Sequence, residues 1–342
     1  MEIEVWSGWL GGLAIGLFVI LHFWLMGKPA GCSTGYGNVC GLLCKKIKYY
    51  HQGEYSDRNN TKLWFLIGIP LGGVLSALGS PDSWTFSFDM GMYKAVLPQS
   101  NAAKAIWLIF GGMLIGFGAR LAGACTTGHA LVGGAMMNPP SLLAAAVFFI
   151  SAMLTTQLLF LIWILALIMY KLPILQSIKL FLISFSFVYR ANFLALIMGV
   201  FFGFLMSRAG ATTYDYHAKM FLLIDFQLMQ VIGTAVVVAM IGVFLLKKYQ
   251  VRSITTGAEV DFVKKPYTQG LVTGAFLFGI GWAMTASCPG TVPAMIGEGK
   301  IGAIFVLIGL LIGTMAFGVL QAYIAQDGNI QQACTWEDNQ NK

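Results

Sequence analysis

The sequence predicts an all-α integral membrane protein with about nine transmembrane helices, about four short re-entrant helices and two inverted repeats. Composition carries the first part of this prediction, because 57% of the 342 residues are hydrophobic and only 10% are charged. Soluble globular domains carry about 25% charged residues. A small-residue motif that recurs along the chain carries the rest.

Apolar runs locate the expected spans, since a transmembrane helix needs roughly 20 mostly apolar residues. The predicted spans are 8–26, 62–79, 105–122, 142–169, 174–189, 191–206, 228–246, 269–285 and 302–323. The apolar block 142–189 is too long for one helix. We expect its break at Lys171 and Pro173, because proline removes a backbone donor and clashes with the preceding turn. No basic segment precedes the first span, which we therefore expect to be retained rather than cleaved.

Positive charge concentrates in two connections, 27–61 and 247–268, which are separated by six predicted spans. Both connections therefore fall on one face, and the positive-inside rule makes that face cytoplasmic. The N-terminus is then expected outside and the C-terminus in the cytoplasm. These loops explain the net charge of +7. With no basic cluster interleaved with aromatic residues, membrane lipid is the expected partner and nucleic acid is not.

A glycine precedes the centre of a small-residue motif by nine residues in three places. The pairs are Gly116 and Cys125, Gly203 and Thr212, and Gly279 and Cys288. A looser fourth copy, GKPAGCSTGYG, carries Cys32. Four spans accompany two motifs on each side of the helix at 174–189, so that single helix inverts the second copy, as in many secondary transporters. The predicted parts are a first half at 1–173, a linking helix at 174–190, a second half at 191–323 and a polar cytoplasmic tail at 324–342.

The motif texts GACTTGH and ASCPGT do not suit a helix interior. Irregular backbone survives in lipid only where it is buried in protein or lines a polar cavity. We therefore expect each preceding span to end inside the membrane, turn at the motif and restart as a short helix. The candidate short helices are 38–47, 129–137, 216–224 and 291–297.

Helices that restart inside a membrane direct free N–H groups and a positive dipole end at whatever lies in front of them. Neutral donors there would bind an anion without trapping it. The expected binding residues are Cys32, Cys125 and Cys288, whose polarizable sulfur suits a ligand that carries soft sulfur. Further candidates for the substrate path are Thr34, Thr126, Thr127, Thr212, Ser287, Thr291, Arg120 and Arg208. Neither a metal nor a cofactor is expected, because no C-x-x-C pair or clustered ligand set occurs.

A structural alternative stays open, because small residues at helix ends often only let backbones approach each other. Recurrence of the motif favours a functional interpretation. His129 and His217 close two of the motifs, and each can be a capping residue or a proton carrier. Cys40 and Cys44 suit interfacial packing.

The stretch GARLAGACTTGHALVGG, at 118–134, resembles the signature of the YeeE/YedE family, the sulfur-transport domain. GIGWAMTASCPG resembles the second cysteine motif of that family, and GKPAGCSTGYG its N-terminal one. The resemblance implies a transporter rather than an enzyme, with thiosulfate uptake across the bacterial inner membrane. It also implies that the ligand passes along Cys32, Cys125 and Cys288 by S–H···S contacts. A small cytoplasmic sulfur-carrier protein of the sulfurtransferase type is the implied companion.

Two other functions remain as alternatives to thiosulfate uptake. The chain could import another sulfur or selenium oxyanion, using the same cysteines. It could instead be a membrane-bound sulfurtransferase that forms a cysteine persulfide, which requires a thiol with a lowered pKa. Cys40, Cys44 and the tail after 324 are not placed in the family pattern, and Cys334, in that tail, is expected to be incidental.

Overall fold

The computed structural model describes residues 4–44, 47–52, 55, 60–80, 84–167, 190–260, 262 and 264–326, and within these ranges it is helical, without a β-strand. The long helices are α1 (Gly8–Met26), α3 (Thr61–Leu78), α4 (Asn101–Leu121), α5 (Pro139–Leu167), α6 (Arg190–Arg208), α8 (Gln227–Lys248), α9 (Leu271–Thr285) and α11 (Gly302–Gln326). The short ones are α2 (Cys32–Leu43), η4 (Thr127–Gly133), α7 (Tyr214–Phe221) and α10 (Thr291–Gly297), with 3₁₀ turns η1 (Lys48–His51) and η3 (Gly91–Ala95).

Six of the long helices are long and apolar enough to cross a membrane: α1, α3, α4, α5, α8 and α11. The apolar helices α6 and α9 are shorter. Each of these eight helices overlaps a predicted span and differs from it by at most four residues at either end, and α1 matches 8–26. The predicted span at 174–189 and the break at Lys171 and Pro173 lie outside the described residues. The total of nine spans therefore stays a prediction.

The short helices differ more from their predicted limits. Only α10 begins and ends where the sequence predicts; α2 begins six residues early, at Cys32. The turn predicted at this motif does not form there: Gly35 and Gly37 lie inside α2, where close neighbours leave no room for a side chain. A Cβ on Gly35 would come within 2.8 Å of the Lys62 carbonyl oxygen. The chain turns earlier, at Gly27, where φ is +70°.

The second and third short helices also begin two residues earlier than predicted. η4 spans Thr127–Gly133 and is a π-helix, whose hydrogen bonds reach five residues along the chain. The predicted segment, 129–137, therefore begins two residues late and ends four residues late. α7 spans Tyr214–Phe221 rather than 216–224.

The long helices pack in pairs through close backbone contacts. The pairs are α3 with α6, α1 with α8, α4 with α11, α5 with α9, and α4 with α9. Glycines make this approach possible: a Cβ on Gly72 of α3 would lie 2.9 Å from the backbone of Gly203 in α6. Likewise, a Cβ on Gly112 of α4 would lie 3.1 Å from the Cα of Gly309 in α11. In both pairs the two helices run in the same direction.

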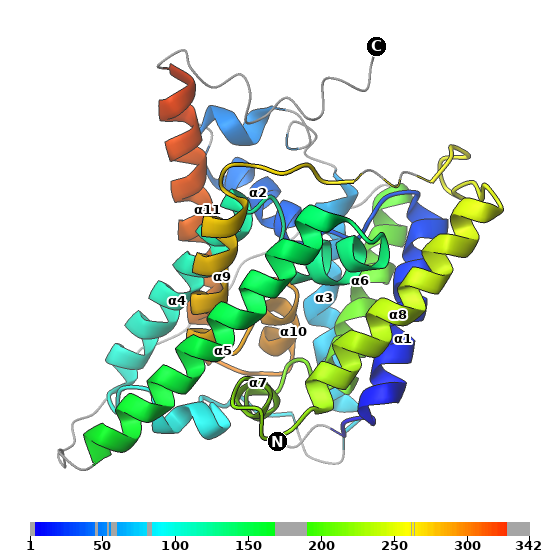
Figure 1. Ribbon diagram of the computed structural model, residues 1–342. Coiled ribbons are helices and arrows are strands. Elements are labelled where there is room, and N and C mark those ends of the chain that lie inside the picture. The colour runs from blue at the N-terminus through cyan, green and yellow to red at the C-terminus, as the bar shows by residue number, and fades with distance from the viewer. Residues whose placement is uncertain are drawn as a thin grey trace.

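The beginning of α1 and the end of α11 lie at opposite ends of the bundle (Figure 1). The connection after α8 reaches the end of α1, where the Ser253 hydroxyl donates to the Leu25 carbonyl at 3.0 Å. Further along, Lys265 Nζ donates to the Gly123 carbonyl beyond α4, at 3.2 Å. The described parts of both basic connections therefore share one end of the bundle, which we call the inner end.

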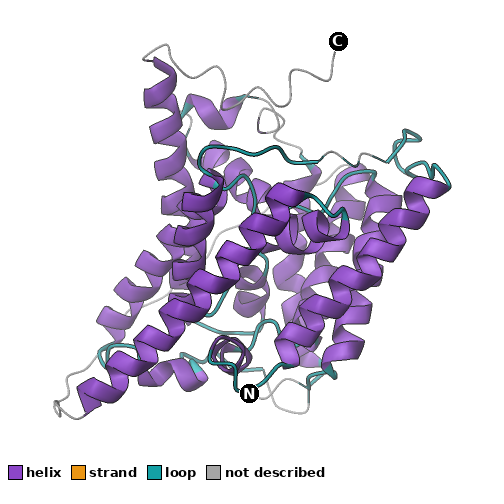
Figure 2. Cartoon of the chain, in the orientation of Figure 1, coloured by secondary structure: helices purple, strands orange, loops and turns teal. Residues whose placement is uncertain are grey.

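The connection after α3 covers α10 at the other end, the outer end. There the Trp84 indole N–H donates to the Gly297 carbonyl at 2.9 Å. The Ser87 N–H donates to the Gly299 carbonyl, also at 2.9 Å. Loops gather at these two ends and helices fill the space between them (Figure 2).

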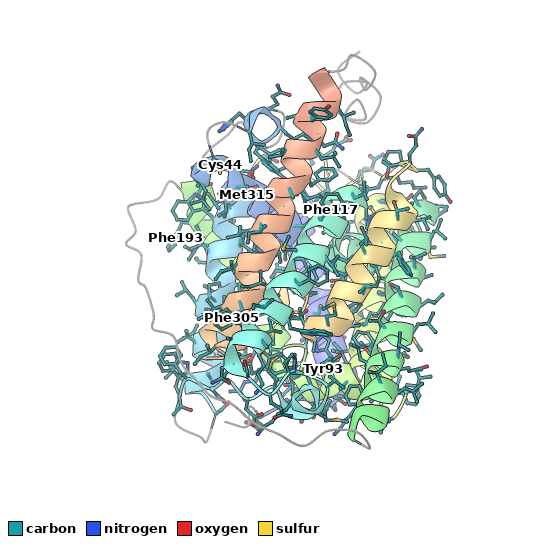
Figure 3. The ribbon with its side chains drawn as sticks, turned by 90° about the vertical axis from the view of Figure 1, so that its left-hand side faces the viewer. Cys44, Tyr93, Phe117, Phe193, Phe305 and Met315 are labelled. Atoms are coloured by element: carbon teal, nitrogen blue, oxygen red, sulfur yellow. The ribbon has the colours of Figure 1, made fainter. Side chains whose placement is uncertain are left out.

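The flanks of the bundle carry large apolar side chains. Phe193 of α6 is 59% exposed and Leu154 of α5 is 61% exposed, and Phe193 projects outward from the ribbon (Figure 3). Such surface is costly in water but suits lipid. The chain is therefore an all-α, multi-pass membrane protein.

Candidate functional site

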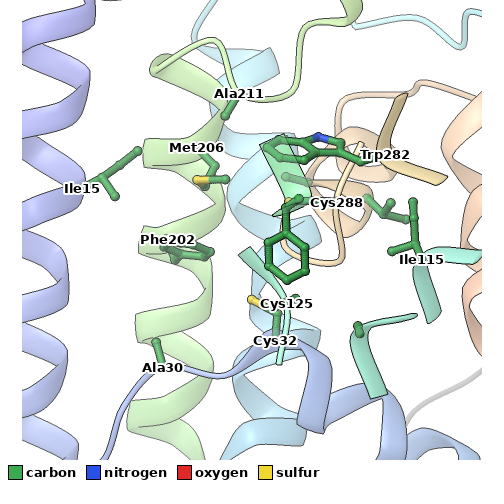
Figure 4. Close-up of a cluster of buried hydrophobic side chains, with 14 of the residues drawn as sticks. Ile15, Ala30, Cys32, Ile115, Cys125, Phe202, Met206, Ala211, Trp282 and Cys288 are labelled. Carbon is green, nitrogen blue, oxygen red and sulfur yellow. The ribbon is translucent and has the colours of Figure 1, made fainter. Parts of the chain in front are cut away.

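The structure brings the three motif cysteines together at the centre of the bundle. Cys32, Cys125 and Cys288 are 0%, 1% and 4% exposed, and their side chains gather in one cluster (Figure 4). Gly290 lies beside the first of them, because a Cβ placed there would be 3.4 Å from Cys32 Sγ and 3.6 Å from Thr127 Cγ2. Each thiol lies within electrostatic reach of the other two. We call this group the central cluster.

The turns at Cys125 and Cys288 are built alike, although they lie in different halves of the chain. The Cys125 carbonyl accepts the N–H groups of the residues three and four positions on, at 3.0 and 2.9 Å. The Cys288 carbonyl does the same, at 3.0 Å for both. Each cysteine therefore stands immediately before a helical turn. At the second motif the Cys288 N–H itself donates to Thr291 Oγ1 at 2.8 Å.

Threonine hydroxyls lie beside the thiols. Thr127 Oγ1 is 3.0 Å from Cys125 Sγ, and Thr291 Oγ1 is 3.6 Å from Cys288 Sγ. Thr126 reaches the Cys288 thiol from the other motif. The Thr291 hydroxyl is engaged within its own turn, where it donates to the Cys288 carbonyl at 3.1 Å. The neutral donors of the central cluster are therefore the thiols and the hydroxyls of Thr126 and Thr127.

A cavity of about 50 Å³ adjoins the cluster on the side of Cys288. Its lining is mostly apolar. The residues with polar groups in the lining are Cys288, Thr126, Thr127, Thr291, His217 of α7 and Trp282 of α9. The volume exceeds the roughly 15 Å³ that one water molecule needs. A few convergent polar groups in an apolar cavity are typical of a small-ligand site.

Three of the other predicted path residues are placed differently. The Thr212 side chain is fully buried, and its backbone carbonyl accepts a hydrogen bond from Lys300 Nζ at 2.8 Å. The Ser287 hydroxyl donates to Thr285 Oγ1 at 3.0 Å, so it is engaged within its own turn. Thr34 follows Cys32 by two positions on α2, about 200° around the helix. Thr34 therefore lies on a different face of α2 from the cluster.

The two predicted arginines lie at opposite ends of the bundle. Arg208 donates to the backbone carbonyls of Gly79 at 2.9 Å and Ser76 at 3.3 Å, at the outer end of α3. Arg120 faces tyrosines near the inner end and lies within electrostatic reach of Cys125. The geometry therefore gives Arg208 a bonding role at a helix end, and its place on the path remains an untested prediction.

His129 is engaged through both ring nitrogens, with Ser141 Oγ at 3.0 Å and the Ala122 carbonyl at 2.9 Å. His217 Nδ1 lies 3.1 Å from the Thr213 carbonyl. These contacts favour a structural part for His129. In the described portion of the chain, no three His, Cys, Asp or Glu side chains are grouped to hold a metal ion. Thiols, hydroxyls and backbone N–H groups are thus the donors that the site offers.

Tyr36 belongs to the site, although the sequence analysis did not single it out. It is fully buried on α2, and its hydroxyl donates to the Pro289 carbonyl at 2.8 Å. This bond ties α2 to the turn that carries Cys288. The signal was present, because Tyr36 follows Cys32 by four positions and so shares its helix face.

Comparison with known proteins gives the family. The chain matches the family described as Sulphur transport over residues 2–154 and 208–339, segments that contain all three cysteines. It is similar to a probable transporter of Xylella fastidiosa, strain Temecula1, at 34% identity over 154 residues, which are 44% of this chain and 93% of that protein. A probable transporter of strain 9a5c is 32% identical over the same shares. This membrane protein therefore belongs to the sulphur transport family.

Proposed function

We propose that the protein carries thiosulfate across the bacterial inner membrane, along a central path lined by Cys32, Cys125 and Cys288. The observation that carries this proposal is the gathering of three buried thiols, from motifs far apart in sequence, in the central cluster. Thiosulfate is a dianion with one soft terminal sulfur. Thiols can approach that sulfur as weak S–H donors, while threonine hydroxyls serve its oxygens.

The neutrality of the cluster suits transport. A buried dianion loses its hydration, and this loss is costly unless donors replace the water. Hydroxyls, thiols and the N–H groups at helix starts are such donors, and none of them carries a full charge. The ligand is therefore bound strongly enough to enter and weakly enough to leave.

We propose in addition that 1–173 and 191–323 are inverted halves, joined by a helix at 174–190 and followed by a cytoplasmic tail at 324–342. The helix pairs support this: when the helices of the halves are matched in order, α3 with α6 corresponds to α8 with α1, and α4 with α11 corresponds to α9 with α5. The half-length relatives support it too, since 154 residues are 93% of one and 44% of this chain.

The shared inner end of the basic connections supports a cytoplasmic placement of that end, with the N-terminus outside. A thiosulfate ion released there would meet a small sulfur-carrier protein in the cytoplasm. This partner follows from the family resemblance, and a pull-down with the full-length membrane protein would test it.

A growth assay tests the proposed function. Bacteria without their own thiosulfate uptake, given thiosulfate as the only sulfur source, should grow when they carry this chain. Cys125→Ala and Cys288→Ala should each abolish growth while the protein remains in the membrane. Cys44→Ala is the matched control, because Cys44 lies at the far end of α2 from the cluster and should be dispensable. Normal growth of both cluster variants would exclude the thiol path.

Two further measurements separate the alternatives. Uptake of labelled thiosulfate into vesicles, with sulfate and selenite as competitors, distinguishes thiosulfate from another sulfur or selenium oxyanion. Mass analysis of the protein after sulfur treatment would reveal a cysteine persulfide if the chain were a sulfurtransferase. The thiosulfate proposal expects competition by thiosulfate alone and no persulfide.

A further inference from the structure

Arg120 has no carboxylate partner among the residues that the structure describes. It lies in the last turn of α4 and is partly buried. Across the described residues, no Asp or Glu comes within ion-pairing distance of it. Its guanidinium instead bonds the Tyr55 hydroxyl and lies 5.9 Å from the centre of the Tyr55 ring. A buried charge is costly unless it is paired. Within the described residues no acidic side chain pairs with Arg120, so a bound anion could fill that role.

One face of α2 leads from the central cluster to Arg120. Cys32, Tyr36 and Cys40 follow one another at intervals of four residues, and all three are fully buried. Residues at this spacing lie above one another on a helix, so Cys40 is about 12 Å along α2 from Cys32. Cys40 lies within electrostatic reach of Arg120. Arg120 itself lies within reach of Cys125, which completes the link to the cluster.

Tyrosines surround this position at the inner end. The Tyr55 ring packs on Gly37 of α2. The Tyr50 hydroxyl donates to the Thr314 carbonyl of α11 at 2.5 Å. Burial raises the pKa of Tyr50, so its phenol stays a neutral donor. Cys44 and Met315 lie nearby, at the end of the bundle opposite to Tyr93 and Phe305 (Figure 3).

We propose that Arg120, the Tyr55 hydroxyl and the Cys40 thiol form a second oxyanion-binding site, at the inner end of the path. The identity of its ligand rests on the proposed function. The guanidinium supplies N–H donors with a full charge, and the phenol supplies an O–H donor. The Cys40 thiol donates to the Leu311 carbonyl at 3.7 Å and would turn to the ligand as a weak S–H donor. A full charge here draws the anion out of the neutral central cluster.

Three variants test the site by thiosulfate uptake into vesicles. Arg120→Gln should raise KM or lower the uptake rate about tenfold or more, the effect of losing a hydrogen bond to a charged group. Arg120→Lys keeps the charge and should stay within about threefold, because its ammonium still attracts the anion. Arg252→Gln is the matched control, since Arg252 is exposed on the connection at the same end and should have no effect. Equal kinetics for Arg120→Gln and Arg252→Gln would overturn the proposal.

A binding measurement covers the outcome that Arg120→Gln folds poorly. Thiosulfate should raise the unfolding temperature of the purified full chain, because it binds the folded state. Part of this rise should persist in Cys288→Ala and disappear in Cys288→Ala combined with Arg120→Gln, while Arg120→Lys keeps it. No rise in Cys288→Ala alone would contradict a second site. Loss of growth in Cys288→Ala with normal uptake by Arg120→Gln would leave the proposed function intact and remove only this inference.

Discussion

Arg120 and Arg208 occupy equivalent places in the sequence and different surroundings in the fold. Each lies in the last turn of an apolar helix, five or four residues before a motif centre. Arg208 meets two backbone carbonyls at the end of α3 and the carboxylate of Glu4, at 3.3 Å. Arg120 meets tyrosines and thiols and, among the described residues, no carboxylate. Arg208 is thus bonded to the ends of other segments of the fold, whereas Arg120 is the arginine for which we propose a ligand.

The largest expected effect on stability is that of replacing Arg208. Arg208→Gln should lower the free energy of unfolding by roughly 2–4 kcal/mol. The last carbonyls of α3 would lose the charged, buried guanidinium that donates to them, and hydrogen bonds to charged groups are stronger than neutral ones. Thermal unfolding in detergent measures this. Arg120→Gln is the comparison, and its free energy of unfolding should fall much less, because the Tyr55 hydroxyl can bond to water in place of the guanidinium. Equal losses in the two variants would remove the distinction.

An intermediate effect is expected where a neutral bond holds the central cluster. Tyr36→Phe should lower the free energy of unfolding by about 1–2 kcal/mol, because the Pro289 carbonyl loses its buried donor. It should also slow thiosulfate uptake, since the turn carrying Cys288 is no longer tied to α2. Tyr214→Phe is the matched control: this tyrosine is buried too, and its hydroxyl has no hydrogen-bond partner within the described residues. If both variants lost the same stability, the bond to Pro289 would have no special part.

The smallest expected effect on stability is at Gly290, beside the Cys32 thiol. A methyl group on Gly290 would meet its neighbours at 3.4–3.7 Å, which is ordinary contact. Gly290→Ala should therefore change the free energy of unfolding by less than about 1 kcal/mol yet reduce uptake, because the methyl fills space beside Cys32. At Gly297 a Cβ would come within 2.9 Å of the Pro70 carbonyl carbon, so Gly297→Ala should destabilise clearly. Unchanged uptake in Gly290→Ala would place the ligand elsewhere.

Composition predicted the long helices well, because a membrane imposes length and apolarity on each span. The helix at Gly8–Met26 matches its predicted range, and α11 begins where the sequence indicated. The convergence of Cys32, Cys125 and Cys288 followed from the repeated motif and its spacing. The start of α2 did not follow, since Gly35 carries the same residue signal whether it forms a turn or permits close packing.

The different bonding partners of Arg120 and Arg208 could not be predicted from the sequence either. Their local sequences are alike, and the difference depends on which helix end or tyrosine group comes alongside in space. Tyr36 was missed for a related reason, because its partner, the Pro289 carbonyl, is 253 positions away in the chain. Local sequence indicates what a residue can bond, and the fold decides what it meets.

The glycine contacts between α3 and α6, and between α4 and α11, join helices that lie far apart in the sequence at very close range. No side chains lie between these backbones that could change conformation and keep the helices in contact. Rotating one helix of a pair away from the other would therefore break the contacts. Whatever displacement accompanies passage of an ion is cheapest in the short helices and their turns. We therefore expect the long helices to stay fixed while the short helices and their turns move, rather than one group of long helices to rock against another.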